Sequence, residues 1–141
     1  MNWVYDDGGR EAAGFRGDAG DCVTRAIAIA TRRPYREVYD DLFEGARAKP
    51  DKRIAGGRRS PRDGVLPKVY RPYLERLGLP WTPTMSIGSG TTVHLRSNEL
   101  PPGRLIVRCS KHLTAVIDGM IHDTHDPSRD GTRAVYGYWR A

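Results

Sequence analysis

An Asp-Gly pair between two apolar runs is the feature that most limits how this chain can fold. Asp118-Gly119 separates residues 112–117 from residues 120–124, and both runs are rich in residue types common in β-strands. An Asp-Gly loop of two residues favours the tight turn of an antiparallel hairpin. That turn also sets the pairing of the two strands, with Ile117 opposite Met120.

The pairing predicts which polar side chains share a face of the hairpin. Counting outward from the turn, Thr114 lies opposite Asp123. Alternate residues of a strand share a face, so His112 lies on the same face as Thr114 and Asp123. Asp123 is then the diagonal neighbour of His112 and is predicted to reach its ring. His122 points to the other face, and only a slip of one residue would exchange it for Asp123.

Residues 22–31 are predicted to form the first helix, with Cys22 at its beginning. Asp21 is a residue type favoured at the N-cap, so its carboxylate is expected to accept a hydrogen bond from the first turn. The free N–H groups and the macrodipole at a helix N-terminus bias the Cys22 thiol toward thiolate. The small apolar residues of this helix suit close packing against a sheet; they are Ala26, Ile27 and Ala30.

Two further helices are predicted after the first. Apolar residues recur at a helical period over about 35–46 and again over about 65–77. Asp63 is expected to cap the latter helix, and Gly78 is expected to end it. Residues 1–20 are rich in glycine and aspartate and show little period, so they are expected to form a loop.

The second half of the chain has the patterns of β-strands. Besides the hairpin, strands are expected over residues 81–86, 91–95, 104–110 and 134–139. Helices that come first and strands that come later favour the α+β class, with helices packed on an antiparallel sheet. A length of 141 residues suits one domain, residues 1–141.

Composition indicates the expected location and the state of the cysteines. No apolar run is as long as a membrane span, and residues 1–7 are too polar for a signal peptide. The expected location is therefore cytoplasmic, where thiols stay reduced. Cys109 lies in register with Leu105 and Val107 and is expected in the core. A bridge between Cys22 and Cys109 is the alternative.

Cys22, His112 and Asp123 are the residue types of a nucleophile, its base and the acid that orients the base. A cysteine opening a helix, a histidine opening an apolar strand and an acid on the next strand resemble the papain-like cysteine peptidase superfamily. The resemblance is strongest to its compact bacterial branches, the bacteriocin leader peptidases and the relatives of cell-wall amidases. The segments that carry it are Asp21-Cys22, 26–30, 103–107 and 112–117. The whole chain is also similar to uncharacterised bacteriophage and prophage proteins.

The resemblance implies a papain-like fold and a hydrolase, which would be a peptidase, isopeptidase or amidase that works through a thioacyl intermediate. Cys22 would be the nucleophile, His112 the base and then the acid, and Asp123 the residue that orients the imidazole. The implied partner is a protein or peptide substrate. No cofactor, metal ion or membrane is expected to take part.

One position departs from the superfamily pattern. Papain-like enzymes often carry a glutamine about six residues before the cysteine, where its amide donates to the oxyanion. Arg16 stands at that position, and Asp18 closer to the cysteine has no amide either. The Cys22 backbone N–H can supply one donor. The sequence identifies no second donor.

A basic segment favours a second class of function. The net charge is +6, and seven basic residues lie between positions 47 and 62 against one acid, Asp51. They are Arg47, Lys49, Lys52, Arg53, Arg58, Arg59 and Arg62. A mobile loop of this charge would attract an acidic substrate, or would let a non-catalytic protein of the same fold bind nucleic acid or an acidic host protein. A solvated surface without a partner is the simplest alternative.

A group of potential metal ligands is the main rival of the cysteine site. Residues 122–126 read His-Asp-Thr-His-Asp, and Cys22, His112 and His94 could add to them. The chain has no HExxH pattern and no paired CxxC, so the spacing of known metal sites is missing. Residues 126–131 are more simply a turn.

Overall fold

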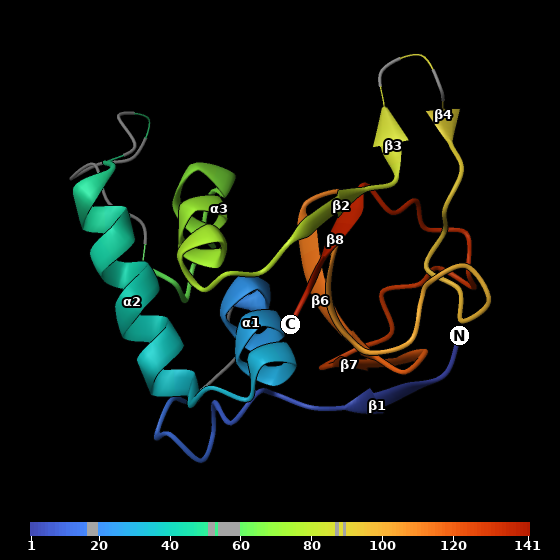
Figure 1. The fold of residues 1–141 in the computed structure, drawn as a ribbon. Coiled ribbons are helices and arrows are strands. Elements are labelled where there is room, and N and C mark those ends of the chain that lie inside the picture. The colour runs from blue at the N-terminus through green and yellow to red at the C-terminus, as the bar shows by residue number, and fades with distance from the viewer. Residues whose placement is uncertain (17–19, 51–52, 54–59, 87, 89) are drawn as a thin grey trace.

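The computed structural model describes residues 1–16, 20–50, 53, 60–86, 88 and 90–141 (Figure 1). Its helices are α1 (Cys22–Thr31), α2 (Tyr35–Ala48) and α3 (Pro67–Arg76). Its strands are β1 (Trp3–Tyr5), β2 (Trp81–Pro83), β3 (Met85–Ser86), β4 (Gly90–Thr91), β5 (Arg104–Cys109), β6 (His112–Ile117), β7 (Met120–Asp123) and β8 (Gly137–Arg140). The predicted order, helices before strands, is confirmed except for β1.

The larger sheet has the strand order β1-β7-β6-β5-β8-β2, and its neighbouring strands are antiparallel except for β1 and β7. β3 and β4 form a separate small pair. Figure 1 shows the helices on one side of the sheet, where α1 contacts β5, β6 and β7, and α2 packs on α1 and α3. The predicted α+β class, with helices on a mostly antiparallel sheet, is confirmed.

The hairpin of β6 and β7 has the predicted register. Ala115 pairs with His122, as counting outward from the turn requires. Asp118 and Gly119 both have positive φ, at 48° and 81°, which is the backbone that a two-residue hairpin turn of this kind needs. Asp123 is therefore the last residue of β7 and lies near the beginning of β6.

The N-terminal segment contains a strand that the sequence did not predict. β1 pairs in parallel with β7 at the edge of the sheet, and Tyr5 aligns with Asp123. The expected loop over residues 1–20 was wrong here, because an exposed strand of three residues leaves no readable period. The Asp6 N–H donates to the Asp123 carbonyl at 2.9 Å, so the segment passes the end of β7 before it reaches α1.

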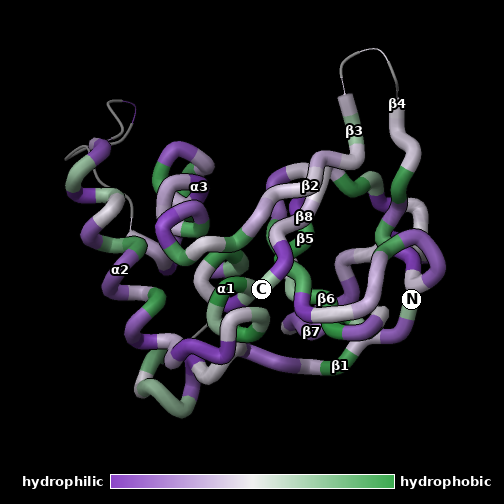
Figure 2. Tube along the Cα trace, in the orientation of Figure 1, coloured by the Kyte–Doolittle hydropathy of each residue, from purple (hydrophilic) through white to green (hydrophobic). Residues whose placement is uncertain are grey.

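α1 is the central helix of the core, as its small apolar residues predicted. Ala26, Ile27 and Ala30 are at most 2 % exposed. They pack in one cluster with Leu113 and Ala115 of β6. Figure 2 shows hydrophobic residues in α1 and in the strands beside it, while hydrophilic residues recur along α2. Among the described residues, no helix has the length and apolar character needed to cross a membrane.

A second apolar cluster lies on the other face of the sheet. Its strand residues alternate with those that face α1 and are Leu105, Val107, Cys109, Val116 and Ile121. Cys109 is 2 % exposed, which confirms its predicted place in the core.

The ends of α2 and α3 differ in detail from the prediction. Leu66 stands at the N-cap of α3, so Asp63 comes too early in the chain to cap it; the Asp63 carboxylate accepts a hydrogen bond from Ser60 Oγ at 3.1 Å. Gly78 follows α3 with a φ of 78°, as predicted for a helix stop. α2 extends to Ala48 and therefore includes Arg47, the first residue of the basic segment.

The expected basic loop falls mostly on residues 51–52 and 54–59, which lie outside the described residues. At the described start of the segment, Lys49 Nζ donates to the Lys68 carbonyl at 3.0 Å, and Lys68 Nζ donates to the Pro50 carbonyl at 3.3 Å. These bonds join the end of α2 to the beginning of α3. The role predicted for the loop stays a prediction.

Candidate active site

The Cys22 thiol lies at the beginning of α1, against the beginning of β6. It is half-buried and lies beside His112 and the backbone of Leu113, which both act on its pKa. Burial raises the pKa of the thiol, but the hydrogen bond and charge of His112, the Leu113 backbone and the Arg25 charge together outweigh it. The net pKa of Cys22 is below its ordinary value, so the site favours thiolate.

Asp123 holds the His112 ring from the other side. Nε2 of His112 lies 2.8 Å from Oδ2 of Asp123, and Thr114 Oγ1 donates to the same oxygen at 2.7 Å. Oδ1 accepts the Thr124 N–H at 2.7 Å and Arg25 Nη2 at 3.3 Å. Burial raises the pKa of Asp123, but the hydrogen bonds from His112, Thr114 and Thr124 lower it to about 2. The acid therefore stays ionised although it is only 2 % exposed.

His112 lies between two groups that favour its protonated form. Burial lowers the pKa of the imidazole, but the hydrogen bonds to Asp123 and Cys22 outweigh burial and raise it to about 9. Nε2 is engaged with Asp123, which leaves Nδ1 for the thiol. The arrangement stabilises a thiolate–imidazolium pair at neutral pH, which is the reactive form of a cysteine nucleophile.

Asp21 does not cap α1 as predicted; it is the centre of a buried charge network. It stands at the N-cap position but makes no side-chain capping bond. Its carboxylate, 1 % exposed, pairs with Arg25, accepts Tyr35 Oη at 2.6 Å and lies 3.3 Å from Arg10 Nε. These donors hold a buried carboxylate more strongly than the backbone amides of a first turn, so they determine its orientation.

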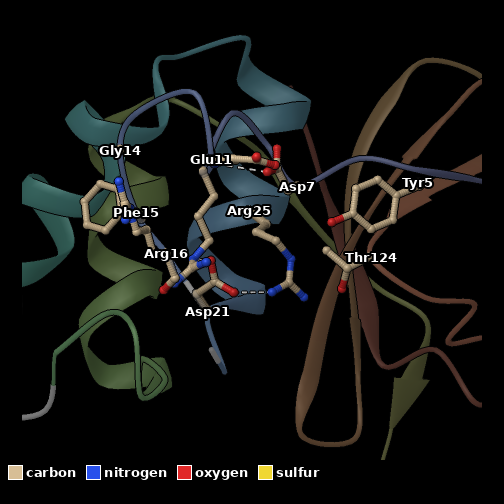
Figure 3. Close-up of a pocket in the computed structure, with 10 residues that line it drawn as sticks. Tyr5, Asp7, Glu11, Gly14, Phe15, Arg16, Asp21, Arg25 and Thr124 are labelled. Atoms are coloured by element: carbon tan, nitrogen blue, oxygen red, sulfur yellow. Dashed lines mark hydrogen bonds and ion pairs between the residues drawn. The ribbon is translucent and has the colours of Figure 1, made fainter. Parts of the chain in front are cut away.

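Arg25 is a site residue that the sequence analysis did not identify. It is 7 % exposed and pairs with both Asp21 and Asp123. Figure 3 shows its side chain reaching from α1 between Asp21 and Thr124. The signal was present in the sequence, because Arg25 is the one charged residue of 22–31 and follows Asp21 by four positions. A charge on a helix buried against a sheet needs partners of opposite charge.

Cys22 and His112 open onto a cleft of about 700 Å³. Residues 63–67, which lead into α3, line the cleft together with Tyr70 of that helix. The space is large enough for a peptide-sized group to reach the thiol.

A second cavity of about 820 Å³ adjoins this cleft and shares Arg25 and Thr124 with it (Figure 3). It does not contain Cys22, so it is not the place where the thiol would react. Arg16, at the position where papain-like enzymes often have glutamine, lines this second cavity. Asp18 lies outside the described residues.

The rival set of metal ligands is brought together only in part. The ligand atoms of His112, Asp123 and His125 lie within 4.8 Å of one another, and the two imidazole centroids are 5.3 Å apart. His122 and His94 face other acids in the structure. The guanidinium beside Asp123 disfavours a second cation at this place, because like charges repel.

Asp126 is the next acid along the chain after Asp123, and Cys109 is the second cysteine; both have structural positions of their own. Asp126 Oδ1 accepts the Ser128 N–H at 3.0 Å, within the predicted turn. Burial raises the pKa of Cys109 to about 11, which makes its thiol unreactive. Cys22 and Cys109 are both free thiols, so the alternative of a bridge between them is wrong.

No family model matches the chain, and neither a curated protein nor a solved structure matches it.

Proposed function

We propose that the chain is a papain-like cysteine hydrolase that cleaves an amide, isopeptide or related acyl bond. One observation carries the proposal: the continuous chain of contacts from Cys22 through His112 to Asp123. A nucleophile beside its base, with the base oriented by a third group, is the arrangement that acyl transfer by cysteine needs. An α+β fold in which the cysteine opens a helix and the histidine opens a strand supports the same assignment.

In the first half-reaction the Cys22 thiolate attacks the carbonyl carbon of the substrate. A C–S bond forms, and the carbonyl oxygen becomes an oxyanion. The Cys22 backbone N–H, which has no partner within the helix because it opens α1, donates to that oxygen. His112 then gives its proton to the leaving amine as the C–N bond breaks, which leaves a thioester and a neutral imidazole.

In the second half-reaction the neutral His112 takes a proton from water. The water oxygen attacks the thioester carbon, the C–S bond breaks, and its electron pair returns to Cys22 as thiolate. The carboxylic acid leaves, and His112 is protonated again. Asp123 keeps its hydrogen bond to Nε2 throughout, so Nδ1 stays directed at the thiol.

The reaction of the protein with p-nitrophenyl acetate tests the proposal. The wild type is expected to release a burst of about one equivalent of p-nitrophenolate, followed by steady turnover. Mass spectrometry of the quenched protein should find the acetyl group on Cys22.

Three variants make the test specific. Cys22→Ala and His112→Ala are expected to lose the burst, while Cys109→Ala, the matched change at the buried thiol, keeps it. A burst that survives in Cys22→Ala, or acetyl on another residue, contradicts the proposal. A non-catalytic binding protein of the same fold would show no steady turnover in any of these forms, even if its thiol were acetylated once.

A further inference from the structure

The cleft beside Cys22 combines apolar walls with positive charge. Residues 65–67 and Leu113 supply apolar surface, and Arg108 and Lys111 supply the charge. Arg108 is half-buried near the end of β5, and Lys111 is exposed in the turn that leads to β6. A ligand that reaches the thiol therefore lies beside two cations.

Arg108 is held in place from two sides. Its positive charge acts on the neighbouring Tyr70 hydroxyl and opposes the rise that burial causes in the pKa of Tyr70, and its Cζ lies 5.8 Å from the centroid of the Tyr136 ring. Tyr70 is itself fixed, because it is 4 % exposed and meets Trp139 edge-on with centroids 5.8 Å apart. A guanidinium carries five N–H donors, more than these two tyrosine neighbours can engage, so N–H groups of Arg108 are available to a ligand.

Neither Arg108 nor Lys111 forms an ion pair with an acid in the part of the chain that the structure describes. Arg25, the other cation of the cleft, is neutralised by Asp21 and Asp123. Asp63 also lines the cleft, so Arg108 and Lys111 together exceed it by one positive charge and the cleft keeps positive charge. A half-buried cation without an acidic partner is stabilised by an anion that enters the site.

We propose that Arg108 and Lys111 form a subsite for a carboxylate of the substrate, beside the acyl bond that Cys22 attacks. The inference rests on the proposed hydrolase function and names its substrate class, a peptide or amide with an acidic group close to the scissile bond. Guanidinium binds carboxylate through paired N–H donors, and partial burial strengthens that attraction. The apolar surface of residues 65–67 and Leu113 accommodates the hydrocarbon part of the same substrate.

Two alkylating agents that differ in charge test the subsite. Iodoacetate and iodoacetamide both transfer their methylene carbon to the Cys22 sulfur with loss of iodide, so the ratio of their rates isolates the effect of the carboxylate. Arg108→Gln is expected to lower the iodoacetate to iodoacetamide ratio about fivefold, the size of one nearby charge in a solvated cleft. Arg108→Lys restores most of the ratio. Arg76→Gln, the matched change at the exposed end of α3, leaves it as in the wild type.

Three chloroacetyl probes identify the source of the carboxylate. N-chloroacetyl-glutamine amide is neutral, N-chloroacetyl-glutamate amide carries a side-chain carboxylate, and N-chloroacetyl-glutamine carries a terminal one. A faster reaction of Cys22 with the second probe indicates an acidic side chain, and a faster reaction with the third indicates a chain terminus. Equal rates for all three overturn the subsite.

The variants are first compared with the wild type by thermal unfolding, so that a change in rate reflects the cleft. An unchanged charge ratio in both Arg108→Gln and Lys111→Gln also overturns the subsite. Alkylation needs no acyl transfer, so the two proposals fail separately. Turnover of p-nitrophenyl acetate without a charge preference refutes the subsite alone, and a charge preference without turnover refutes the hydrolase alone.

Discussion

Arg25 and Asp123 form a buried ion pair, with Nη2 of the guanidinium 3.3 Å from Oδ1 of the carboxylate. Their exposed fractions are 7 % and 2 %. The other oxygen of Asp123 holds His112, so the pair links the helix of Cys22 directly to the hairpin of His112. The relative position of Cys22 and His112 thus depends on the ion pair between Arg25 and Asp123, in which neither Cys22 nor His112 takes part.

Replacing Arg25 is expected to destabilise the fold strongly. Arg25→Met fills a similar volume but removes the cation that the buried Asp21 and Asp123 carboxylates share. Breaking a buried pair in this way costs about 3–5 kcal/mol in free energy of unfolding. Urea unfolding followed by circular dichroism measures it.

The matched control is Arg36→Met on α2. Arg36 pairs with Asp40 at 3.7 Å, and both side chains are exposed. Loss of an exposed pair is expected to cost less than about 1 kcal/mol. If the free energy of unfolding falls equally in the two variants, the Arg25 ion pair contributes no more to stability than a surface pair does.

Cys22 is expected to react long before Cys109. The pKa of Cys22 is lowered, while burial raises that of Cys109 to about 11. In mildly acidic buffer, at about pH 6, iodoacetamide should label Cys22 alone, because the thiolate is the reacting species. Peptide mass spectrometry at timed intervals measures both rates, and labelling of Cys109 at the same rate would refute the assignment.

Asp123→Asn is expected to lower the rate of acylation while the fold is kept. A neutral amide supports the imidazolium less well than a carboxylate, so the pKa of His112 falls and less thiolate is present at neutral pH. We expect the p-nitrophenyl acetate burst to slow by about tenfold to a hundredfold. Asp126→Asn, an isosteric change in the neighbouring turn, should leave the burst rate unchanged; if it slows the burst equally, Asp123 has no special role.

At low pH, the free energy of unfolding should depend on whether the Asp123 carboxylate is ionised. The pKa of Asp123 is lowered in the folded protein from 3.8 to about 2, so the folded carboxylate resists protonation. Its contribution to stability is present above pH 3.8 and is lost as the pH falls through about 2. The difference in free energy of unfolding between the wild type and Asp123→Asn should therefore shrink over that range. A difference that stays constant from pH 4 to about 2 argues against the lowered pKa.

The hairpin and its pair of site residues could be predicted from the sequence because the information is local. Asp118-Gly119 sets the turn, and the turn sets the register of the two strands. His112 and Asp123 are only 11 positions apart, so a correct register is enough to bring them into contact. Cys22 could be placed at a helix start by the same kind of local pattern, the run of small apolar residues that follows it.

The partners of the buried charges could not be predicted in this way. Asp21 has the residue type of an N-cap, and the one local sign of another role is Arg25, four positions further on. Folding buries its carboxylate to 1 % exposure and brings Tyr35 and Arg10 to it from outside the helix. β1 is a similar case, because an exposed strand of three residues forms only where the edge of β7 offers backbone partners.

The sequence by itself therefore determined the turn, the strand register and the helix that begins at Cys22, since each depends on neighbours along the chain. The tertiary structure alone decided that Arg25 joins Asp21 to Asp123 and that Arg108 lies in the cleft beside the thiol. The physical reason is burial. The cost of removing a charge from water selects its partners, and which charges are removed is known only once the whole chain has packed.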